Sequence, residues 1–299
     1  MEKVGIVVVT YNRLALLKEV IASLREQTYN NFQIIVVNNG SNDGTKEWLS
    51  LQKDVHSITQ ENIGGAGGFF TGMKFVLENG FDYCWVMDDD VICHSNALDE
   101  LIKAYKVKSD VGFVCSRVLG TDGCAMNTPV VDTTVTSNGY LDLFDYVEPY
   151  SMVKVIQSSF VSVLVSTKII EEIGLPIKEY FIWGDDSEYT GRISKKYSSY
   201  IACKSVVVHK RKIQKALSFL DEVETKRINF YFYMFRNQAY TNLLHKERKA
   251  FVKYMVKLWV KQGGRAFVKM KFKHLLIVLK ASLALFTFKP VVQFTKRNN

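Results

Sequence analysis

Paired cysteines, long apolar runs and low-complexity tracts are all missing from this sequence of 299 residues. The five cysteines include no CxxC pair, which argues against a cysteine zinc site or a disulfide framework and favours reduced thiols in a cytosolic protein. No apolar run reaches the roughly 18 uncharged residues of a membrane-spanning helix, because Lys280 interrupts the best one, Leu275 to Phe288. The apolar run near the N-terminus follows Glu2 and is too short for a signal peptide, so we expect a first strand there.

Positive charge is also scarce in most of the chain and is concentrated at its end. The whole sequence has 39 basic and 30 acidic residues, a net charge of +9. Residues 245–299 hold 14 Lys and Arg against the single acid Glu247, a net of +13, so residues 1–244 hold 25 basic and 29 acidic residues, a net of −4. A main body with this charge argues against a nucleic-acid-binding protein. With 47% apolar residues, the chain can bury a globular core.

Strand and helix patterns alternate in the first third of the chain. β-branched runs predict strands at Val4–Val9 and Phe32–Val37, and apolar residues at helical spacing over 14–24 predict a helix between them. A further helix is expected from about Phe70 to Glu78, before a buried strand at Tyr83–Met87. This order predicts an α/β fold with a mainly parallel, doubly wound sheet, in which ligands bind beyond the carboxyl ends of the strands.

The later part of the chain is less regular. Residues 120–150 are polar and weakly periodic, which predicts a loop or hairpin excursion. A strand is expected at Ser205–His209, and from about Gln214 the pattern is helical to the end. We therefore predict two domains, an α/β domain at residues 1–213 and an amphipathic helical region at residues 214–299.

Three consecutive aspartates, Asp88, Asp89 and Asp90, end the buried strand at Tyr83–Met87. Neighbouring carboxylates raise one another's pKa, and a divalent cation such as Mg²⁺ or Mn²⁺ relieves that repulsion. Because alternate side chains of a strand share a face, Asp88 and Asp90 are expected to approach one ion while Asp89 points elsewhere. The alternative is a solvated acidic turn that caps the next helix.

The sequence NIGGAGGF at residues 62–69 lacks the Lys-Ser/Thr of a Walker A loop, and Phe70 breaks the GxGxxG pattern. The motif leads into a helix, and a helix start favours a phosphate or sugar nearby. The alternative is a purely structural glycine turn.

Three carboxylates, Asp185, Asp186 and Glu188, lie among aromatic residues in FIWGDDSEY at residues 181–189. Aromatic surroundings raise the pKa of a carboxylate, which makes Asp185 and Asp186 candidate general bases, although helix capping is the alternative. His209 ends a predicted strand and is a candidate third metal ligand, with a structural histidine as the alternative.

Six motifs in order, VTYNR, VVNNGSNDGT, NIGGAGGF, WVMDDD, FIWGDDSEY and VVVHK, resemble those of the family 2 inverting glycosyltransferases of the GT-A fold. The resemblance covers roughly residues 3–240 and is closest to bacterial galactofuranosyltransferases and rhamnosyltransferases. It implies a Rossmann-like GT-A domain with a mixed, mainly parallel sheet and flanking helices. It further implies that a metal, Mn²⁺ or Mg²⁺, is held by Asp88, Asp90 and His209, and that Asp186, with Asp185 as the alternative, is the catalytic base.

The resemblance also implies a substrate site. The first motif lines the nucleotide, the glycine-rich loop lies along the sugar, and Trp183 and Glu188 shape the acceptor pocket. Asn38 stands where the family usually has an acid that contacts the base, so the base is left open. The residues predicted to bind substrate are Thr10, Tyr11, Asn12, Arg13, Asn38, Asp43, Asn62, Gly64, Gly65, Gly67, Gly68, Asp88, Asp89, Trp183 and Glu188.

The implied reaction moves a sugar from a nucleotide-sugar donor to a lipid-linked saccharide, in the synthesis of a cell-surface polysaccharide such as O-antigen. UDP-galactofuranose is the favoured donor and dTDP-rhamnose the alternative. A membrane-bound scaffold or sugar-binding module is the non-enzyme alternative. The intact aspartate motifs favour the enzyme.

Basic, aromatic and aliphatic residues alternate in the C-terminal segment, as in FVKYMVKLWVK at residues 251–261. This composition is typical of a helix at the surface of an anionic membrane, and it predicts a peripheral protein on the cytoplasmic face of the plasma membrane. The alternative is a helix packed on the catalytic domain or in a homo-oligomer.

Overall fold

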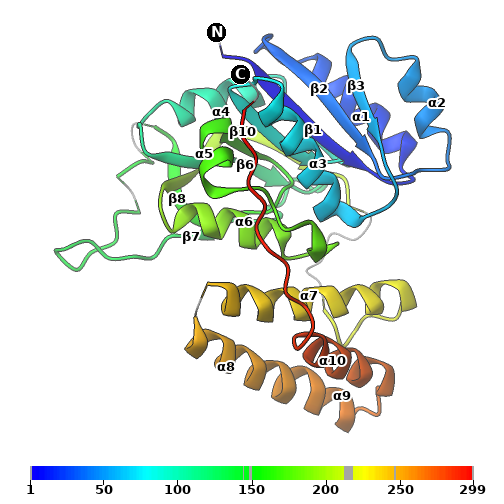
Figure 1. The fold of residues 1–299 in the computed structure, drawn as a ribbon. Coiled ribbons are helices and arrows are strands. Elements are labelled where there is room, and N and C mark those ends of the chain that lie inside the picture. The colour runs from blue at the N-terminus through cyan, green and yellow to red at the C-terminus, as the bar shows by residue number, and fades with distance from the viewer. Residues whose placement is uncertain (1, 144, 148–149, 212–217, 246, 298–299) are drawn as a thin grey trace.

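The computed structural model describes residues 2–143, 145–147, 150–211, 218–245 and 247–297. Figure 1 shows an α/β part built on one twisted sheet and a layer of helices below it. Over the described residues the sheet has the order β3-β2-β1-β4-β9-β6-β10-β8-β7, and β5 pairs with β10 outside this path. The strands are β1 (Val4–Thr10), β2 (Phe32–Asn38), β3 (Val55–Thr59), β4 (Tyr83–Asp88), β5 (Val91–Cys93), β6 (Val111–Leu119), β7 (Val130–Val131), β8 (Met152–Gln157), β9 (Val163–Ser166) and β10 (Ser198–His209).

The sheet is parallel on one side and mixed on the other. β1 pairs in parallel with β2 and β4, and β2 with β3. Beyond β4, β9 runs antiparallel between β4 and β6, while β10 is parallel to β6 and antiparallel to β8 and β5. The predicted α/β fold with a mixed, mainly parallel sheet and flanking helices is confirmed.

Helices cover both faces of the sheet. Alternate residues of β1 point to opposite sides, so Val4, Ile6 and Val8 belong to one buried core and Val7 and Val9 to the other. Because both faces are covered, all seven residues of β1 are buried. The helices on one face are α1 (Leu14–Arg25), α2 (Thr45–Ser50) and α4 (Ala97–Tyr105), and those on the other are α3 (Gly64–Glu78), α5 (Thr167–Ile173) and α6 (Asp185–Ser194).

Helix α3 begins at Gly64, so the expectation that the helix starts near Phe70, after a glycine-rich loop, is wrong. The glycines lie in its first turns, where a Cβ on Gly68 would overlap Val9 and one on Gly72 would overlap Val7. Glycine is a poor helix former, but the close approach of helix to sheet outweighs that propensity.

Two other boundaries differ from the sequence pattern. β10 begins at Ser198 instead of Ser205, because a register shift between Ala202 and Val206 interrupts the alternation. The excursion at residues 120–150 contains the short strand β7 and a bridge between Val135 and Leu141, in keeping with the predicted loop or hairpin.

The C-terminal helices form their own small core. Ile228, Phe235, Leu258 and Val278 are among its buried residues. Among the described residues no helix is both long enough and apolar enough to span a bilayer. The helices are α7 (Thr225–Leu244), α8 (Arg248–Lys257), the π-helix η2 (Leu258–Gly264), α9 (Arg265–Val268) and α10 (Phe272–Ala284).

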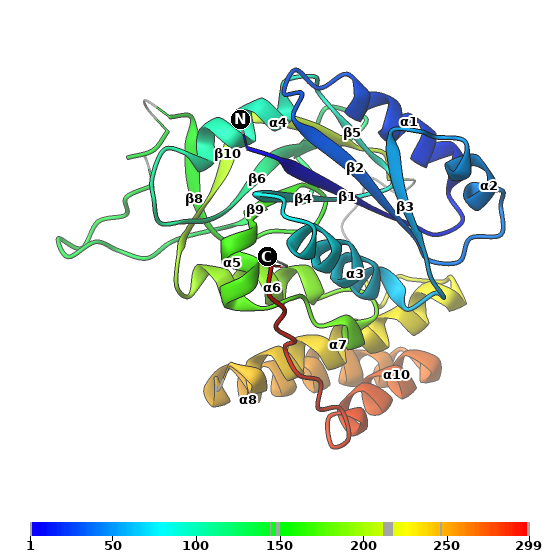
Figure 2. The ribbon, with the colours of Figure 1, turned by 45° about the horizontal axis from the view of Figure 1, so that its top comes forward.

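Residues 285–297, the described part of the chain after α10, are not helical, so the expected helical pattern fails there. Figures 1 and 2 show this segment running past α6 towards α5 and the sheet. The backbone N–H of Leu175 donates to the carbonyl of Gln293 (2.8 Å), and Arg297 Nη2 donates to the carbonyl of Gly80 (2.6 Å). The domain boundary predicted at 213/214 lies outside the described residues, and the two-domain division stays a prediction.

Candidate active site

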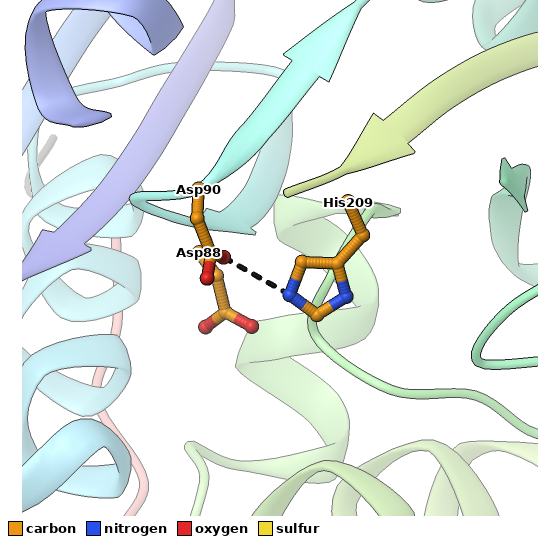
Figure 3. Close-up of side chains that lie close together, drawn as sticks. All are labelled: Asp88, Asp90 and His209. Carbon is orange, nitrogen blue, oxygen red and sulfur yellow. Dashed lines mark ion pairs between the residues drawn. The ribbon is translucent and has the colours of Figure 1, made fainter. Parts of the chain in front are cut away.

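The ends of three strands bring Asp88, Asp90 and His209 together. Asp88 is the last residue of β4, Asp90 precedes β5, and the antiparallel pairing of β5 with β10 sets His209 opposite Val91. One ligand atom from each of the three side chains lies within 4.8 Å of the others (Figure 3). The sequence places these residues 121 positions apart at most, and the sheet closes that separation.

The histidine ring is oriented by a residue that the sequence analysis did not single out. His209 Nδ1 lies 2.9 Å from Asn127 Oδ1, and because an amide oxygen only accepts, Nδ1 carries the hydrogen. In the neutral ring the Nε2 lone pair therefore faces Asp90 Oδ1 at 3.0 Å. That contact calls for a proton or a cation to relieve the repulsion of two lone pairs.

A divalent ion fits this donor set. His209 Nε2 and Asp90 Oδ1 are 3.0 Å apart, and Asp88 offers a ligand atom within 4.8 Å of a ligand atom of each, so the three side chains are close enough to bind one ion. Two carboxylates and an imidazole suit Mn²⁺ or Mg²⁺. Asp88, Asp90 and His209 would hold the ion.

The aspartates differ in their electrostatic surroundings. Burial, and then the charge of Asp90, raise the pKa of Asp88 to about 7, and burial raises the pKa of Asp89 to about 6. Burial opposes ionisation of Asp90 as well, but the hydrogen bond and charge that His209 supplies when its ring is protonated, with the charge of Arg13, outweigh burial and hold the pKa of Asp90 below its usual value. The site therefore concentrates negative charge that a cation stabilises.

Asp89 is not part of the cluster, and because β4 ends at Asp88, the turn that follows and not strand alternation sets its direction. Thr10 Oγ1 donates to Asp89 Oδ2 (2.7 Å), and Arg13 Nη1 contacts both Asp89 (3.1 Å) and Asp90 (2.7 Å). Thr10 is buried and Arg13 is half exposed. Two residues predicted to bind substrate thus also support the aspartates.

The end of β2 contributes a buried amide. Asn38 is fully buried, and its Oδ1 accepts from the backbone N–H of Ser41 (2.9 Å). Its Nδ2 is buried and has no hydrogen-bond partner among the described residues. Asn12 lies beside it in the fold, since its N–H donates to Ser41 Oγ (2.9 Å).

Asp43 and Tyr11 lie around the same loops. Asp43 accepts from the N–H of Leu14 (2.9 Å) and from Thr45 Oγ1 (2.5 Å), so both of its oxygens tie α1 to α2. Burial alone would raise the pKa of Asp43, but these hydrogen bonds outweigh burial and lower the pKa of Asp43 below its usual value. Tyr11 is 42% exposed and free to meet a ligand.

The glycines of residues 64–68 have different surroundings. Gly64 has φ +81° and backs onto Phe181, and its N–H donates to Asn62 Oδ1 (3.0 Å). Gly67 and Gly68 are buried against side chains, whereas a Cβ on Gly65 would have no atom within 4 Å. Open space at this end of α3 therefore lies at Gly65.

Asp185 and Asp186 occupy the first turn of α6. Asp185 is buried, and burial, followed by the charge of Asp186, raises its pKa to about 8. Burial also raises the pKa of Asp186. The Ser187 N–H donates to Asp186 Oδ1 (2.6 Å), which lowers the pKa, but burial outweighs it. Asp186 is the more exposed of the two, which favours it as a base that must reach a substrate.

Glu188 and Trp183 are placed differently from each other. Glu188 is buried between Arg192 (2.9 Å) and His245 (3.3 Å), so its carboxylate joins α6 to the end of α7. Trp183 is partly buried and packs edge-on against Tyr231 of α7, with ring centres 5.3 Å apart. Contact of either residue with an acceptor stays a prediction.

A known family model matches the first half of the chain. The glycosyl transferase family 2 model matches residues 5–144. The match includes Asp88 and Asp90 and ends before Asp185, Asp186 and His209.

Three curated relatives share short segments with the chain. Galactofuranosyltransferase GlfT1 of Mycolicibacterium smegmatis is 35% identical over 91 residues, 30% of each chain. Glycosyltransferase GlyG of Streptococcus pneumoniae is 31% identical over 111 residues, 36% of each chain. The undecaprenyl-phosphate mannosyltransferase of Micrococcus luteus is 27% identical over 142 residues, 45% of this chain and 56% of that one. The matches thus span about a third to a half of the relatives' lengths.

A solved structure shares the fold over a longer range. Staphylococcus aureus TarS residues 1–349, solved in complex with UDP, superposes with a TM-score of 0.58 at 13% sequence identity. The superposition covers 89% of this chain and 74% of that one.

Proposed function

We propose that this chain, whose residues 5–144 match the glycosyl transferase family 2 model, is a metal-dependent, inverting enzyme of that family with the GT-A fold, and that it transfers a sugar to a lipid-linked saccharide. The cluster of Asp88, Asp90 and His209 carries the proposal. It offers a binding site at the end of β4 for the divalent cation that accompanies the diphosphate of a nucleotide sugar. UDP bound to TarS and the two relatives that act on galactofuranose or undecaprenyl phosphate support the same substrate classes. UDP-galactofuranose is the favoured donor and dTDP-rhamnose the alternative.

The residues of the site divide the reaction between them. Asp186 accepts the proton of the acceptor hydroxyl, whose oxygen forms a new bond to the anomeric carbon on the face opposite the leaving group. The bond from that carbon to the diphosphate breaks, and its electron pair leaves with the nucleoside diphosphate. A bound Mn²⁺ or Mg²⁺ would neutralise the diphosphate charge. Asn38 and Tyr11 are proposed to contact the nucleotide.

A panel of nucleotide sugars tests this function. Purified protein with Mn²⁺ and a polyprenyl-linked saccharide is expected to consume UDP-galactofuranose and release UDP, measured with dTDP-rhamnose, UDP-glucose and GDP-mannose alongside. Turnover of dTDP-rhamnose alone would support the alternative donor. An absence of turnover with every donor, in protein that still binds Mn²⁺, would support a membrane-bound scaffold or sugar-binding module.

We further propose that the C-terminal helices lie on an anionic membrane, on the cytoplasmic face of the plasma membrane in polysaccharide synthesis such as that of O-antigen. Helix α8 has no buried residue, and in Figure 1 it lies with α9 on the far side of α7 from the sheet. Exposed apolar and basic side chains alternate along this outer face, a pattern suited to an anionic lipid surface. The apolar ones are Val252, Val256, Val260, Phe267, Val268, Met270 and Phe272, and the basic ones Lys253, Lys257, Lys261, Arg265, Lys269 and Lys273.

Charge reversal on α8 and η2 tests the membrane surface. The triple variant Lys253→Glu, Lys257→Glu, Lys261→Glu is expected to bind phosphatidylglycerol vesicles at least about tenfold more weakly, since each basic residue near the surface contributes about 1 kcal/mol. Vesicle sedimentation in low salt measures the change. The matched control reverses Lys46, Lys53 and Lys204, three exposed lysines of the α/β part. Equal binding by both variants would contradict the proposed surface.

A further inference from the structure

The loop before α6 has a backbone that needs outside support. It joins the short helix η1 (Lys178–Tyr180) to the first turn of α6, which carries Asp186. Phe181 and Trp183 have φ +66° and +60°, in the left-handed region that residues other than glycine rarely adopt. Residues persist in this region when their surroundings hold them there, so the contacts of this loop are informative.

Asn237 of α7 supplies those contacts. Its side chain is fully buried, and its Nδ2 donates to the carbonyls of Trp183 (2.7 Å), Tyr180 (2.9 Å) and Ile182 (3.3 Å). Its Oδ1 accepts from Arg236 Nε (3.0 Å) and Nη2 (2.8 Å). The guanidinium fixes which way the amide faces, because it only donates, and so keeps Nδ2 aimed at the loop.

Arg236 has no carboxylate partner in the part of the chain that the structure describes. It is buried, its Nη2 donates to the carbonyl of Glu179 (2.9 Å), and its guanidinium lies 3.6 Å from the ring centre of Phe288. Burying a guanidinium without a carboxylate partner costs desolvation free energy. We therefore infer that the N–H donors of Arg236 serve a purpose other than charge pairing. Here those donors hold Asn237 and the loop.

The opposite side of the loop rests on α3. The N–H of Ala66 donates to the carbonyl of Phe181 (3.1 Å), and Gly64 lies so close to Phe181 that a Cβ there would overlap its carbonyl. The loop is therefore held between the start of α3, where the family resemblance implies the donor sugar, and α7, which begins the C-terminal helices.

We propose that Asn237 is a positioning residue that sets the conformation of the loop at residues 180–184 and thereby the direction of Asp186. This inference rests on the proposed function, in which Asp186 must meet the acceptor hydroxyl in one geometry. A misplacement of about 1 Å at a reacting group can cost about 10²-fold in rate. Asn237 touches neither substrate nor metal in this scheme, and it acts through the loop.

The variants Asn237→Asp and Asn237→Ala test the inference. Asn237→Asp keeps the partner of Arg236 but sets an acceptor against the loop carbonyls, and Asn237→Ala removes both. Each is expected to lower kcat about 10²-fold while KM for the donor and the affinity for Mn²⁺ change less than about threefold. The matched control is Asn242→Asp on the same helix, whose side-chain amide makes no hydrogen bond with the described residues.

Amide hydrogen exchange separates this inference from the proposed function. In both Asn237 variants exchange is expected to speed up over residues 180–188 and to stay unchanged over residues 84–93, a result that needs no turnover. If the wild type turns over no donor yet the exchange result holds, the proposed function fails and the clamp on the loop stands. Unchanged exchange, a kcat within threefold of wild type, or failure of both variants to fold would overturn the positioning role.

Discussion

Asp186→Asn is expected to lower kcat for sugar transfer about 10³-fold, because the amide cannot accept the proton of the acceptor hydroxyl and a general base contributes about 10²- to 10⁴-fold. Asparagine keeps the size of the side chain and can still accept from the N–H of Ser187. The affinities for Mn²⁺ and for UDP should therefore stay within about threefold of wild type. Single-turnover transfer from the nucleotide sugar, with calorimetry for the two ligands, measures these quantities.

The pH dependence of the wild type provides a second readout of the same base. Because burial raises the pKa of Asp186, the carboxylate takes up its proton at a higher pH than a free aspartate does. Activity should therefore fall as the pH drops through that raised value, and the acid limb of kcat should lie above the usual aspartate range. A loss that is larger in Asp185→Asn than in Asp186→Asn would assign the base to Asp185 instead.

The fold and the metal cluster were predictable because they follow from patterns of short range. Alternation in a strand predicts that Asp88 and Asp90 lie together without Asp89; the structure does bring Asp88 and Asp90 together, although β4 ends at Asp88 and a turn carries the other two. Parallel strands bring Thr10 and Asn38 to the same edge, as their pairing in β1 and β2 shows. Each of these inferences needs only the period of a strand and the direction of the chain.

Residues whose contacts depend on tertiary packing could not be recognised from the sequence pattern. Asn127 lies in a weakly periodic excursion, and only the folded chain places it against His209. Asn237 lies within an aromatic helix and meets a loop 54 residues earlier. The glycines of α3 resembled a ligand loop in the sequence, whereas Gly68 faces Val9 because the helix lies close to the sheet. Spacing along the chain cannot distinguish a glycine that faces a ligand from one that faces a strand.

The acidic and basic parts of the sequence lie in different parts of the structure. The acidic body places three aspartates at one strand end, where Arg13 contacts two of them. Helices α8 and α9 of the basic segment lie on the far side of α7 from the sheet, and α7 also contacts the loop before α6. Helix α7 is therefore the physical connection between the proposed membrane surface and the proposed base.

Asp90→Asn is expected to weaken Mn²⁺ binding more than 100-fold and to leave less than about 1% of sugar transfer, because it removes a charged ligand and its contact with His209. EDTA should abolish transfer by the wild type, and added Mn²⁺ should restore it. Asn127→Ala should have a graded effect, about 10- to 100-fold weaker Mn²⁺ binding, since it leaves the ligands in place and frees the histidine ring.

The matched control for Mn²⁺ affinity lies within the same three aspartates. Asp89 is bound by Thr10 and Arg13 and is not part of the cluster, so Asp89→Asn should keep the affinity for Mn²⁺ within about threefold of wild type. Calorimetry and the electron paramagnetic resonance of free Mn²⁺ measure the affinities of all three variants. Equal losses in Asp89→Asn and Asp90→Asn would mean that net charge alone attracts the ion, and would contradict a site built from Asp88, Asp90 and His209.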